Sequence, residues 1–189
     1  MNIQSKVKNY ITRYAPSYKR LLTYLEKKKV NHPEKFIVQM GYDEAIMLDA
    51  WMNTFINQGK SISQITVKLM TKEFTKESIA QGIQKYESTL KDWDQYEKYI
   101  VQKIETYLYR KKSQKEIYIT LCREYPYFSE QMKDLLDSYD DSKSLRFYMQ
   151  KYAKKYDMNT FEGKNKYFQA LMRRGFSYQR IQEQEEKDL

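Results

Sequence analysis

The chain has 189 residues, of which 41% are hydrophobic and 31% are charged, so its composition excludes a disordered polypeptide. It contains only 5 Gly and 3 Pro, too few for the many turns of a β-sandwich or barrel, and long helices are favoured. The 34 basic and 25 acidic side chains give a net charge of +9, which is typical of a protein with a polyanionic partner. The alternative is a lysine-rich composition inherited from an AT-rich genome.

Three features predict a cytoplasmic protein that is not associated with a membrane. The single cysteine, Cys122, cannot form an internal disulfide. No apolar run approaches the roughly 18 residues of a membrane span. Segment 1–14 is polar and lacks the apolar region of a signal peptide. We also expect a monomer without a cofactor.

One short pattern recurs along the chain at intervals of 44, 52 and 50 residues. A small residue is followed by an apolar residue four positions later and by Leu after four more, which places both apolar side chains on one helical face. Ser at the first position is a preferred N-cap. The four copies are Ser17-Leu21-Leu25, Ser61-Ile65-Leu69, Ser113-Ile117-Leu121 and Gly163-Tyr167-Leu171. We call the helices that they predict the leader helices. Gln64 and Glu116 follow two of the serines at the spacing of a capping box.

A second helix follows each leader helix, and a third follows in most cases. In two copies the second helix opens with the same pattern, an aromatic residue before a Thr or Ser cap and Ile four residues after the cap: Phe74-Thr75 with Ile79, and Phe176-Ser177 with Ile181. Helical stripes predict third helices from about residues 43, 96 and 145. In the first copy, Pro33 leaves room only for a short helix near residues 34–40 and suits its first turn.

These elements predict an all-α fold of tandem three-helix repeat units that form an elongated, curved helical array. The predicted divisions are an N-terminal extension (1–16), a degenerate unit (17–60), two complete units (61–112 and 113–162) and a partial two-helix unit (163–189). The acidic tail of the last unit, from Glu183 to Leu189, is expected to fray.

The C-terminal residues carry a resemblance to a known family. Leu171, Arg173-Arg174, Gly175-Phe176-Ser177-Tyr178 and Ile181 resemble the C-terminal signature of the RecX family of recombinase regulators. A second match begins at the acidic pair Asp43-Glu44, which opens a helix that Gly59-Lys60 closes, and Ile65, Leu69, Lys72 and Ile79 follow at family-like spacing. The resemblance covers about residues 17–182. The chain departs from the family in lacking the usual Gly after the Lys run of its first unit and in having Glu73 where Gly is common.

The resemblance implies a function as well as a fold. RecX-like proteins are curved arrays of three-helix units that bind the RecA recombinase, especially its filament on DNA, and modulate its recombinase and ATPase activities in homologous recombination and DNA repair. They are not enzymes. We therefore expect a regulator, and an inhibitor in particular, whose partners are RecA and its DNA filament.

No constellation in the sequence predicts catalysis or a metal. One His, His32, and one Cys cannot build the usual structural zinc site, and a triad would have to use His32 beside a proline. Gly59-Lys60-Ser61 resembles the end of a phosphate-binding loop, but Thr54 stands where that loop needs Gly, and a helix precedes it instead of a strand. The carboxylates Asp137, Asp140 and Asp141 miss the spacing of a calcium loop and predict a solvated helix start.

The basic residues are the candidate site. Between residues 143 and 180, ten basic side chains face only Asp157 and Glu162, and aromatic residues are interleaved among them, as in surfaces that bind nucleic acid. A solvated face for the cations and core packing for the tyrosines are the alternatives. The predicted partner- or DNA-backbone-binding residues are Lys60, Lys68, Lys72, Lys154, Lys155, Arg173 and Arg174, and the predicted core includes Trp51, Leu69, Leu121, Leu171 and Phe176.

Two other functions stay open. Three-helix units also resemble helix-turn-helix modules, which would make the chain a sequence-specific DNA-binding regulator with a recognition helix. A helical scaffold that binds an acidic protein would explain the charge without nucleic acid.

Overall fold

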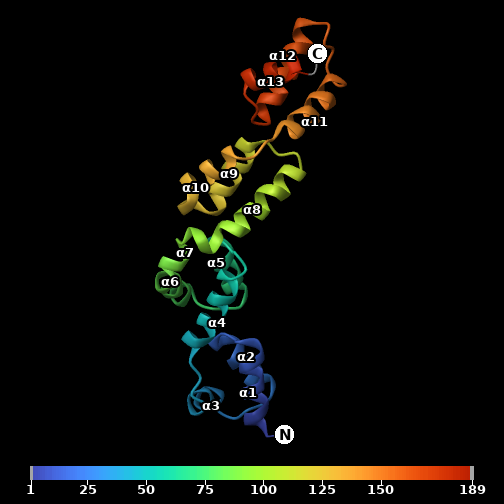
Figure 1. Ribbon diagram of the computed structural model, residues 1–189. Helices are drawn as coiled ribbons and strands as arrows, with labels where there is room; N and C mark the ends of the chain where they lie inside the picture. The colour runs from blue at the N-terminus through green and yellow to red at the C-terminus, as the bar shows by residue number, and fades with distance from the viewer. Residues whose placement is uncertain (1, 188–189) are drawn as a thin grey trace. The chain divides into compact units, whose positions relative to one another are not determined.

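The computed structural model describes residues 2–187, which form helices joined by turns and contain no strand, so the predicted all-α class is confirmed (Figure 1). No helix within these residues has both the length and the apolar character that a bilayer span requires. The helices, in chain order, are α1 (Ile3–Tyr14), α2 (Tyr18–Lys27), α3 (Pro33–Gln39), α4 (Glu44–Ile56), α5 (Ile62–Thr71), α6 (Lys76–Lys85), α7 (Glu87–Leu90), α8 (Trp93–Tyr109), α9 (Gln114–Glu124), the 3₁₀ helix η1 (Pro126–Phe128), α10 (Ser129–Asp137), α11 (Ser142–Ala153), α12 (Phe161–Arg173) and α13 (Tyr178–Lys187).

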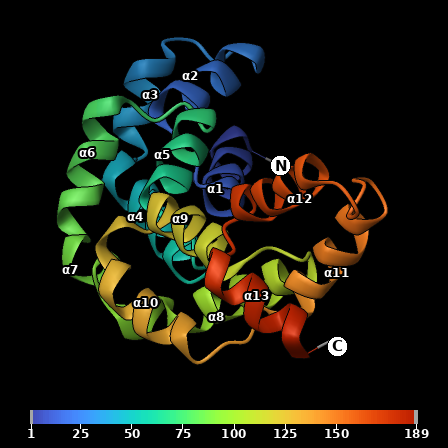
Figure 2. The ribbon, with the colours of Figure 1, turned by 90° about the horizontal axis from the view of Figure 1, so that it is seen from above.

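The chain divides into two compact units, unit 1 (Met1–Gln95) and unit 2 (Tyr96–Leu189). In unit 1, α2 packs on α3, and α4, α5 and α6 pack on one another. In unit 2, α9 and α10 lie side by side, and α11, α12 and α13 form a second group (Figure 2). These packing groups begin one helix before the predicted sequence units. α4, the third helix of the first sequence unit, packs on the two helices of the next, and α11 does the same with α12 and α13.

Three of the four copies of the leader pattern adopt the same local structure, a helix that begins at a capping Ser. Ser17, Ser61 and Ser113 are the N-caps of α2, α5 and α9, and each side chain accepts a hydrogen bond from the backbone three residues later. All three serines are buried, and the two apolar residues that follow each of them are fully buried. The capping box is complete only at Ser61, where Gln64 bonds back to the cap.

The fourth copy differs at its first position. α12 begins at Phe161 with Thr160 as its N-cap, so Gly163 lies in the first turn of the helix rather than at the cap. Tyr167 and Leu171 are buried as the pattern predicts. A Cβ atom at Gly163 would lie 1.9 Å from the carbonyl oxygen of Asp157, so the loop before α12 needs a residue without a side chain there.

Left-handed backbone conformations recur at matching places. Lys29, Glu73 and Gly175 follow α2, α5 and α12 with φ of 54°, 65° and 95°. In each case the next residue donates its backbone N–H to the last Leu of the leader pattern, as in a Schellman motif. Glu73, which stands where RecX-like sequences often have Gly, therefore has the conformation that favours Gly, at a cost of about 1 kcal/mol. Ala15, Gly59 and Lys111 are likewise left-handed, each two residues before a capping Ser.

Two terminal segments differ from the sequence prediction. The predicted extension 1–16 contains α1, whose Val7 is buried in a cluster with Leu21, Leu25 and Ile37 of α2 and α3. The prediction that the acidic tail frays from Glu183 is wrong as far as Lys187, because α13 continues to that residue and Gln184 is buried. Asp188 and Leu189, the last residues of that tail, lie outside the described residues.

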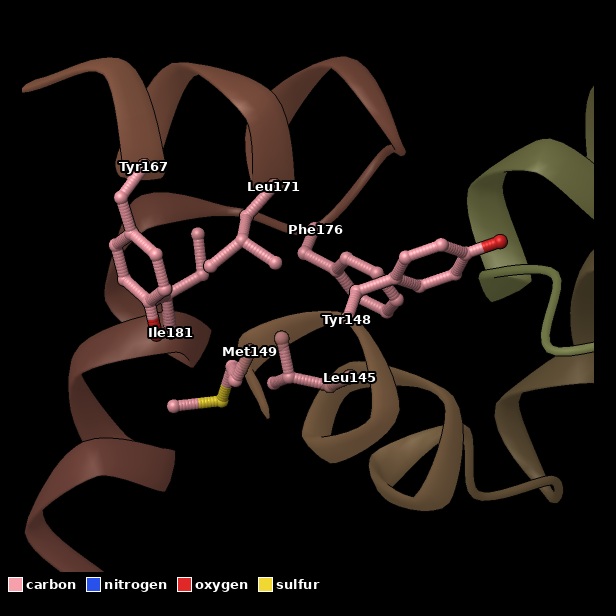
Figure 3. Packing of buried hydrophobic residues seen from close by; sticks show 7 residues of the cluster. All are labelled: Leu145, Tyr148, Met149, Tyr167, Leu171, Phe176 and Ile181. Atoms are coloured by element: carbon pink, nitrogen blue, oxygen red, sulfur yellow. The ribbon is translucent and has the colours of Figure 1, made fainter. Parts of the chain in front are cut away.

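The hydrophobic cluster of the last group joins all three of its helices (Figure 3). Its side chains converge from α11, α12, α13 and the turn before α13, and each fully buried aliphatic side chain contributes about 1.5–3 kcal/mol. Because Leu171, Phe176 and Ile181 meet here, the apolar positions of the C-terminal motif are explained by packing. The cluster consists of Leu145, Tyr148, Met149, Tyr167, Leu171, Phe176 and Ile181.

Candidate functional site

Two of the predicted lysines of unit 1 lie on aromatic rings of α4. The Nζ of Lys68 is 5.6 Å from the ring centroid of Phe55, and the Nζ of Lys72 is 3.3 Å from that of Trp51. Both are cation–π contacts, worth about 0.5–2 kcal/mol depending on exposure. The Trp51 indole also donates a hydrogen bond to the carbonyl of Ala15 at 2.8 Å. Trp51 was predicted as core, but it is only half-buried, and Lys72 lies over its ring.

A third cation, Arg20, lies close to these lysines. Burial lowers the pKa of Lys72, and the charges of Arg20 and Lys68 lower it further. Arg20 Nη2 donates to the carbonyl oxygen of Thr71, the last residue of α5, at 2.8 Å. The carbonyl end of a helix attracts positive charge, which helps to hold the three cations together. The sequence prediction missed Arg20, because 51 residues separate it from Thr71 and no spacing rule connects them.

Lys60 is placed away from this cluster. It is half-buried in the turn between α4 and α5, where its backbone N–H donates to the carbonyl oxygen of Phe55 at 3.0 Å. Lys60 precedes the ten-residue helix α5 and Lys72 follows it, so they are about 15 Å apart along the helix axis. The three predicted lysines of unit 1 therefore do not form one compact site.

The predicted arginine pair of unit 2 is divided between surface and core. Arg173, the last residue of α12, is exposed. Arg174 is half-buried, with its Cζ atom 4.7 Å from the ring centroid of Tyr148 and its Nε donating to the hydroxyl of Tyr152 at 3.3 Å. That hydrogen bond raises the pKa of Arg174 above its ordinary value. Packing explains Arg174, whereas Arg173 is exposed and makes only a hydrogen bond from its Nε to the carbonyl oxygen of Gln169, at 3.3 Å, among the contacts described for unit 2.

The motif glycine has a clear structural role. Gly175 has φ of 95°, and a Cβ atom there would lie 2.6 Å from the Oγ of Ser113. The same hydroxyl donates to the carbonyl oxygen of Arg174 at 2.5 Å and accepts from the backbone of Glu116. The C-terminus of α12 thus docks directly on the N-terminus of α9, and only glycine satisfies both the backbone conformation and the close approach.

Lys154 and Lys155 follow the last residue of α11 and are both exposed. The Nζ of Lys155 lies 5.4 Å from the ring centroid of Tyr156. Tyr152 and Tyr156 pack against the cluster of Figure 3, which agrees with the core alternative for these rings. The two lysines therefore add exposed positive charge at the end of a helix whose Tyr148 and Tyr152 pack inward, while its Phe147 is exposed.

The prediction of a solvated helix start at Asp137, Asp140 and Asp141 is wrong for Asp141. Its side chain is only 3% exposed, and its Oδ2 accepts from the backbone N–H of Gln114, the first residue of α9, at 2.8 Å. Arg180 Nη2 lies 2.6 Å from Oδ1. The angular geometry of that contact is too poor for a hydrogen bond, so it is an ion pair. Asp140 is exposed, as predicted, and Asp137 is exposed too, but it is the last residue of α10 and therefore lies at a helix end and not at a helix start.

Arg180 joins three partners in this network. Besides Asp141, it donates to the side chain of Gln114 at 3.0 Å and to Asp140 at 3.3 Å. Gln114 in turn donates to the carbonyl oxygens of Leu136 and Tyr139. One of the ten basic residues between 143 and 180 is therefore engaged in holding α9 and α13 together. Another, Lys166, pairs with Glu162 at 2.5 Å. The charge available to a partner is smaller than the sequence count indicates.

Comparison of the chain with protein-family models, with curated proteins and with solved structures gives no match. Within residues 2–187, no group of three or more His, Cys, Asp or Glu side chains could hold a metal ion. Each unit thus has its own set of exposed cations, and the interpretation of these cations rests on their geometry within the unit and on the resemblance of the motif.

Proposed function

We propose that the chain is a non-enzymatic regulator that binds a RecA-type recombinase and its filament on DNA and inhibits its recombinase and ATPase activities. The observation that carries the proposal is the C-terminal motif from Leu171 to Ile181, which resembles the RecX signature. The packing of the motif supports a division of roles within it. Leu171, Phe176 and Ile181 are core and Gly175 is a docking point, whereas Arg173 and Tyr178 are exposed and available to a partner.

The charge distribution supports the same proposal. A net charge of +9 attracts the chain to a nucleoprotein filament, and phosphate contacts would supply much of that attraction. Exposed cations occur in both units, including Lys68 in unit 1 and Lys154, Lys155 and Arg173 in unit 2. Several weak contacts on one chain add through effective concentration, so none of them needs to be strong.

Charge reversal at exposed cations tests the proposal without disturbing the core. We expect Arg173→Glu combined with Lys154→Glu to weaken binding to a recombinase filament on single-stranded DNA at least tenfold. We also expect the dependence of log K on log salt to become less steep by about 1–2. Fluorescence anisotropy of the labelled filament at several salt concentrations measures both. Arg174 is left unchanged, because its contacts with Tyr148 and Tyr152 would confound binding with stability.

The matched control reverses one Arg and one Lys elsewhere in unit 2. Arg123 and Lys98 are exposed, and Arg123→Glu with Lys98→Glu makes the same change in net charge. Circular dichroism must show both variants to be as helical as the wild type. An equal loss of affinity in the two variants would mean that binding depends on net charge alone. Unchanged affinity in both would contradict the proposed surface.

One observation favours a second candidate, the sequence-specific DNA-binding regulator. α5 and α6 are joined by the short turn 72–75 and pack with α4, an arrangement similar to a helix-turn-helix module. In that case α6, which Thr75 caps, would be the recognition helix. Protection of one defined duplex in a footprinting experiment, without any recombinase, would favour this candidate over the filament regulator.

A further inference from the structure

Unit 1 contains a pocket that the predicted site residues do not include. It lies between α1, α2 and the turn after α5, and its volume is about 330 Å³. Five of its lining residues come from a single stretch of α2. The pocket is lined by Tyr10, Lys19, Arg20, Thr23, Tyr24, Lys27 and Glu73. We call it the α2 pocket.

Three cations of the α2 pocket have no carboxylate partner. Lys19 and Lys27 are exposed and eight residues apart on α2, so they lie on one side of the helix together with Thr23. Among residues 2–187, no carboxylate oxygen lies within ion-pair distance of Lys19, Arg20 or Lys27, although Glu73 also lines the pocket. The pocket therefore has a net charge of +2, which a phosphate group would neutralise.

Arg20 is held in position for such a contact. Its Nη2 donates to the carbonyl oxygen of Thr71 at 2.8 Å, which fixes the guanidinium at the end of α5. That bond uses one of its five N–H donors. Burial lowers the pKa of Lys72 and the charge of Arg20 lowers it further, whereas burial raises the pKa of Tyr10 and the charge of Arg20 opposes that rise, so Arg20 acts on both groups. Positive charge thus extends from the α2 pocket to the cation cluster on α5.

An aromatic wall completes the pocket. The rings of Tyr10 and Tyr24 are stacked, with centroids 4.0 Å apart and planes 4° from parallel. Both tyrosines are half-buried, so each presents part of its ring or hydroxyl to the pocket. Cations that contact phosphate together with aromatic side chains that contact bases are the two elements of single-strand recognition. An acidic peptide would use the cations but would not need the rings.

We propose that the α2 pocket binds a nucleotide unit of a single-stranded nucleic acid. Lys19, Arg20 and Lys27 contact its phosphate, and the base lies against the Tyr10–Tyr24 pair. This binding requires no recombinase, so it stands or falls separately from the function proposed above. A free mononucleotide has the same chemistry, and the experiment distinguishes it from a strand.

The test is direct binding of a fluorescein-labelled 20-residue oligothymidylate to the full chain, followed by anisotropy at several salt concentrations. Lys19→Gln with Lys27→Gln is expected to weaken binding about tenfold or more and to reduce the salt slope by up to about 0.7, since the pocket contacts one phosphate and a single strand contributes about 0.7 per phosphate contact. The matched control, Lys35→Gln with Lys76→Gln, removes two exposed charges of unit 1 outside the pocket and is expected to reduce the affinity much less. These surface changes leave the hydrophobic cluster of α1–α3 intact.

Competitors then identify the bound chemistry. Release of the strand by AMP at concentrations where inorganic phosphate has no effect supports a nucleotide pocket. Direct binding of AMP that is lost in the Lys19/Lys27 variant, without strand binding, supports the same chemistry with a free nucleotide as its source. If AMP and inorganic phosphate release the labelled strand equally well, the base adds nothing to binding, and the proposed contact between the base and the two tyrosines is wrong. Indistinguishable affinities for wild type, pocket variant and control overturn the proposal, as does the absence of binding to either ligand.

Discussion

Asp141→Ala is expected to lower the free energy of unfolding by about 3 kcal/mol, one of the largest effects of a single substitution in this chain. The carboxylate is almost fully buried and accepts the first backbone N–H of α9 while it pairs with Arg180. Its removal leaves that N–H without its acceptor and leaves a partly buried guanidinium with only Gln114 and the exposed Asp140. Unpaired groups of this kind cost more than the intact pair contributes.

Urea unfolding followed by circular dichroism measures this loss, and hydrogen exchange locates it. Protection should fall in α9 and α13, the two helices that the network joins. Asp137→Ala, at an exposed position at the end of α10, is the control and should change stability by less than about 0.5 kcal/mol. In a double-mutant cycle, Asp141 and Arg180 should show a coupling of about 1–3 kcal/mol. Equal effects of the two alanine substitutions at 137 and 141 would show that the network does not stabilise unit 2.

Gly163→Ala is expected to destabilise the chain by about 2–3 kcal/mol, although Ala in a helix is ordinarily about 1 kcal/mol better than Gly. The added Cβ would lie 1.9 Å from the carbonyl oxygen of Asp157 and 2.8 Å from the Oγ1 of Thr160. Backbone and cap must both move, and the cap bond from Gly163 N–H to Thr160, now 3.1 Å, would be lost. The steric cost thus reverses the sign of the propensity effect.

Thr160→Ala separates the two contributions, because it removes the cap and adds no atom. The loss of an N-cap alone costs about 1 kcal/mol, so Gly163→Ala should be clearly the more damaging change in thermal or urea unfolding. A neutral or stabilising Gly163→Ala would mean that residues 157–160 do not pack against α12 as described.

The leader pattern shows how much of the fold could be predicted from sequence. A capping Ser with apolar residues four and eight positions later defines a local structure, and three copies formed it as predicted. Local rules also placed Pro33 in the first turn of a short helix and Asp43 at the start of α4. The same rules misplaced the start of α12. Gly163 matched the spacing, but the capping side chain belongs to Thr160, three residues earlier.

The missed features all depend on contacts between residues far apart in the chain. Arg20 reaches Thr71, and Arg180 reaches Gln114 and Asp141, across 51, 66 and 39 positions. The sequence analysis predicted that Arg180 is a free cation and that Asp141 is solvated, because composition gives the number of charges and does not show which of them form pairs. Helix α1 was overlooked for a related reason. Its Val7 becomes part of a core only through α2 and α3.

The predicted site residues differ in their surroundings. Exposed lysines and arginines occur where the charge pattern indicated, at the ends of α5, α11 and α12. Their roles differ, however, since Arg174 packs on Tyr148 and Lys72 on Trp51 while Arg173 and Lys154 are exposed. Whether a cation meets solvent or a ring depends on packing, which the sequence pattern does not describe.

The most direct test of the proposed function is the ATPase rate of a RecA-type recombinase on single-stranded DNA while this chain is titrated in. The recombinase should come from the same organism, and the chain should be shown to be helical under the assay conditions. We expect a dose-dependent fall in rate at fewer than one chain per recombinase subunit, because a regulator of filament assembly affects many subunits at once. An unchanged rate up to a several-fold excess of folded chain would contradict it.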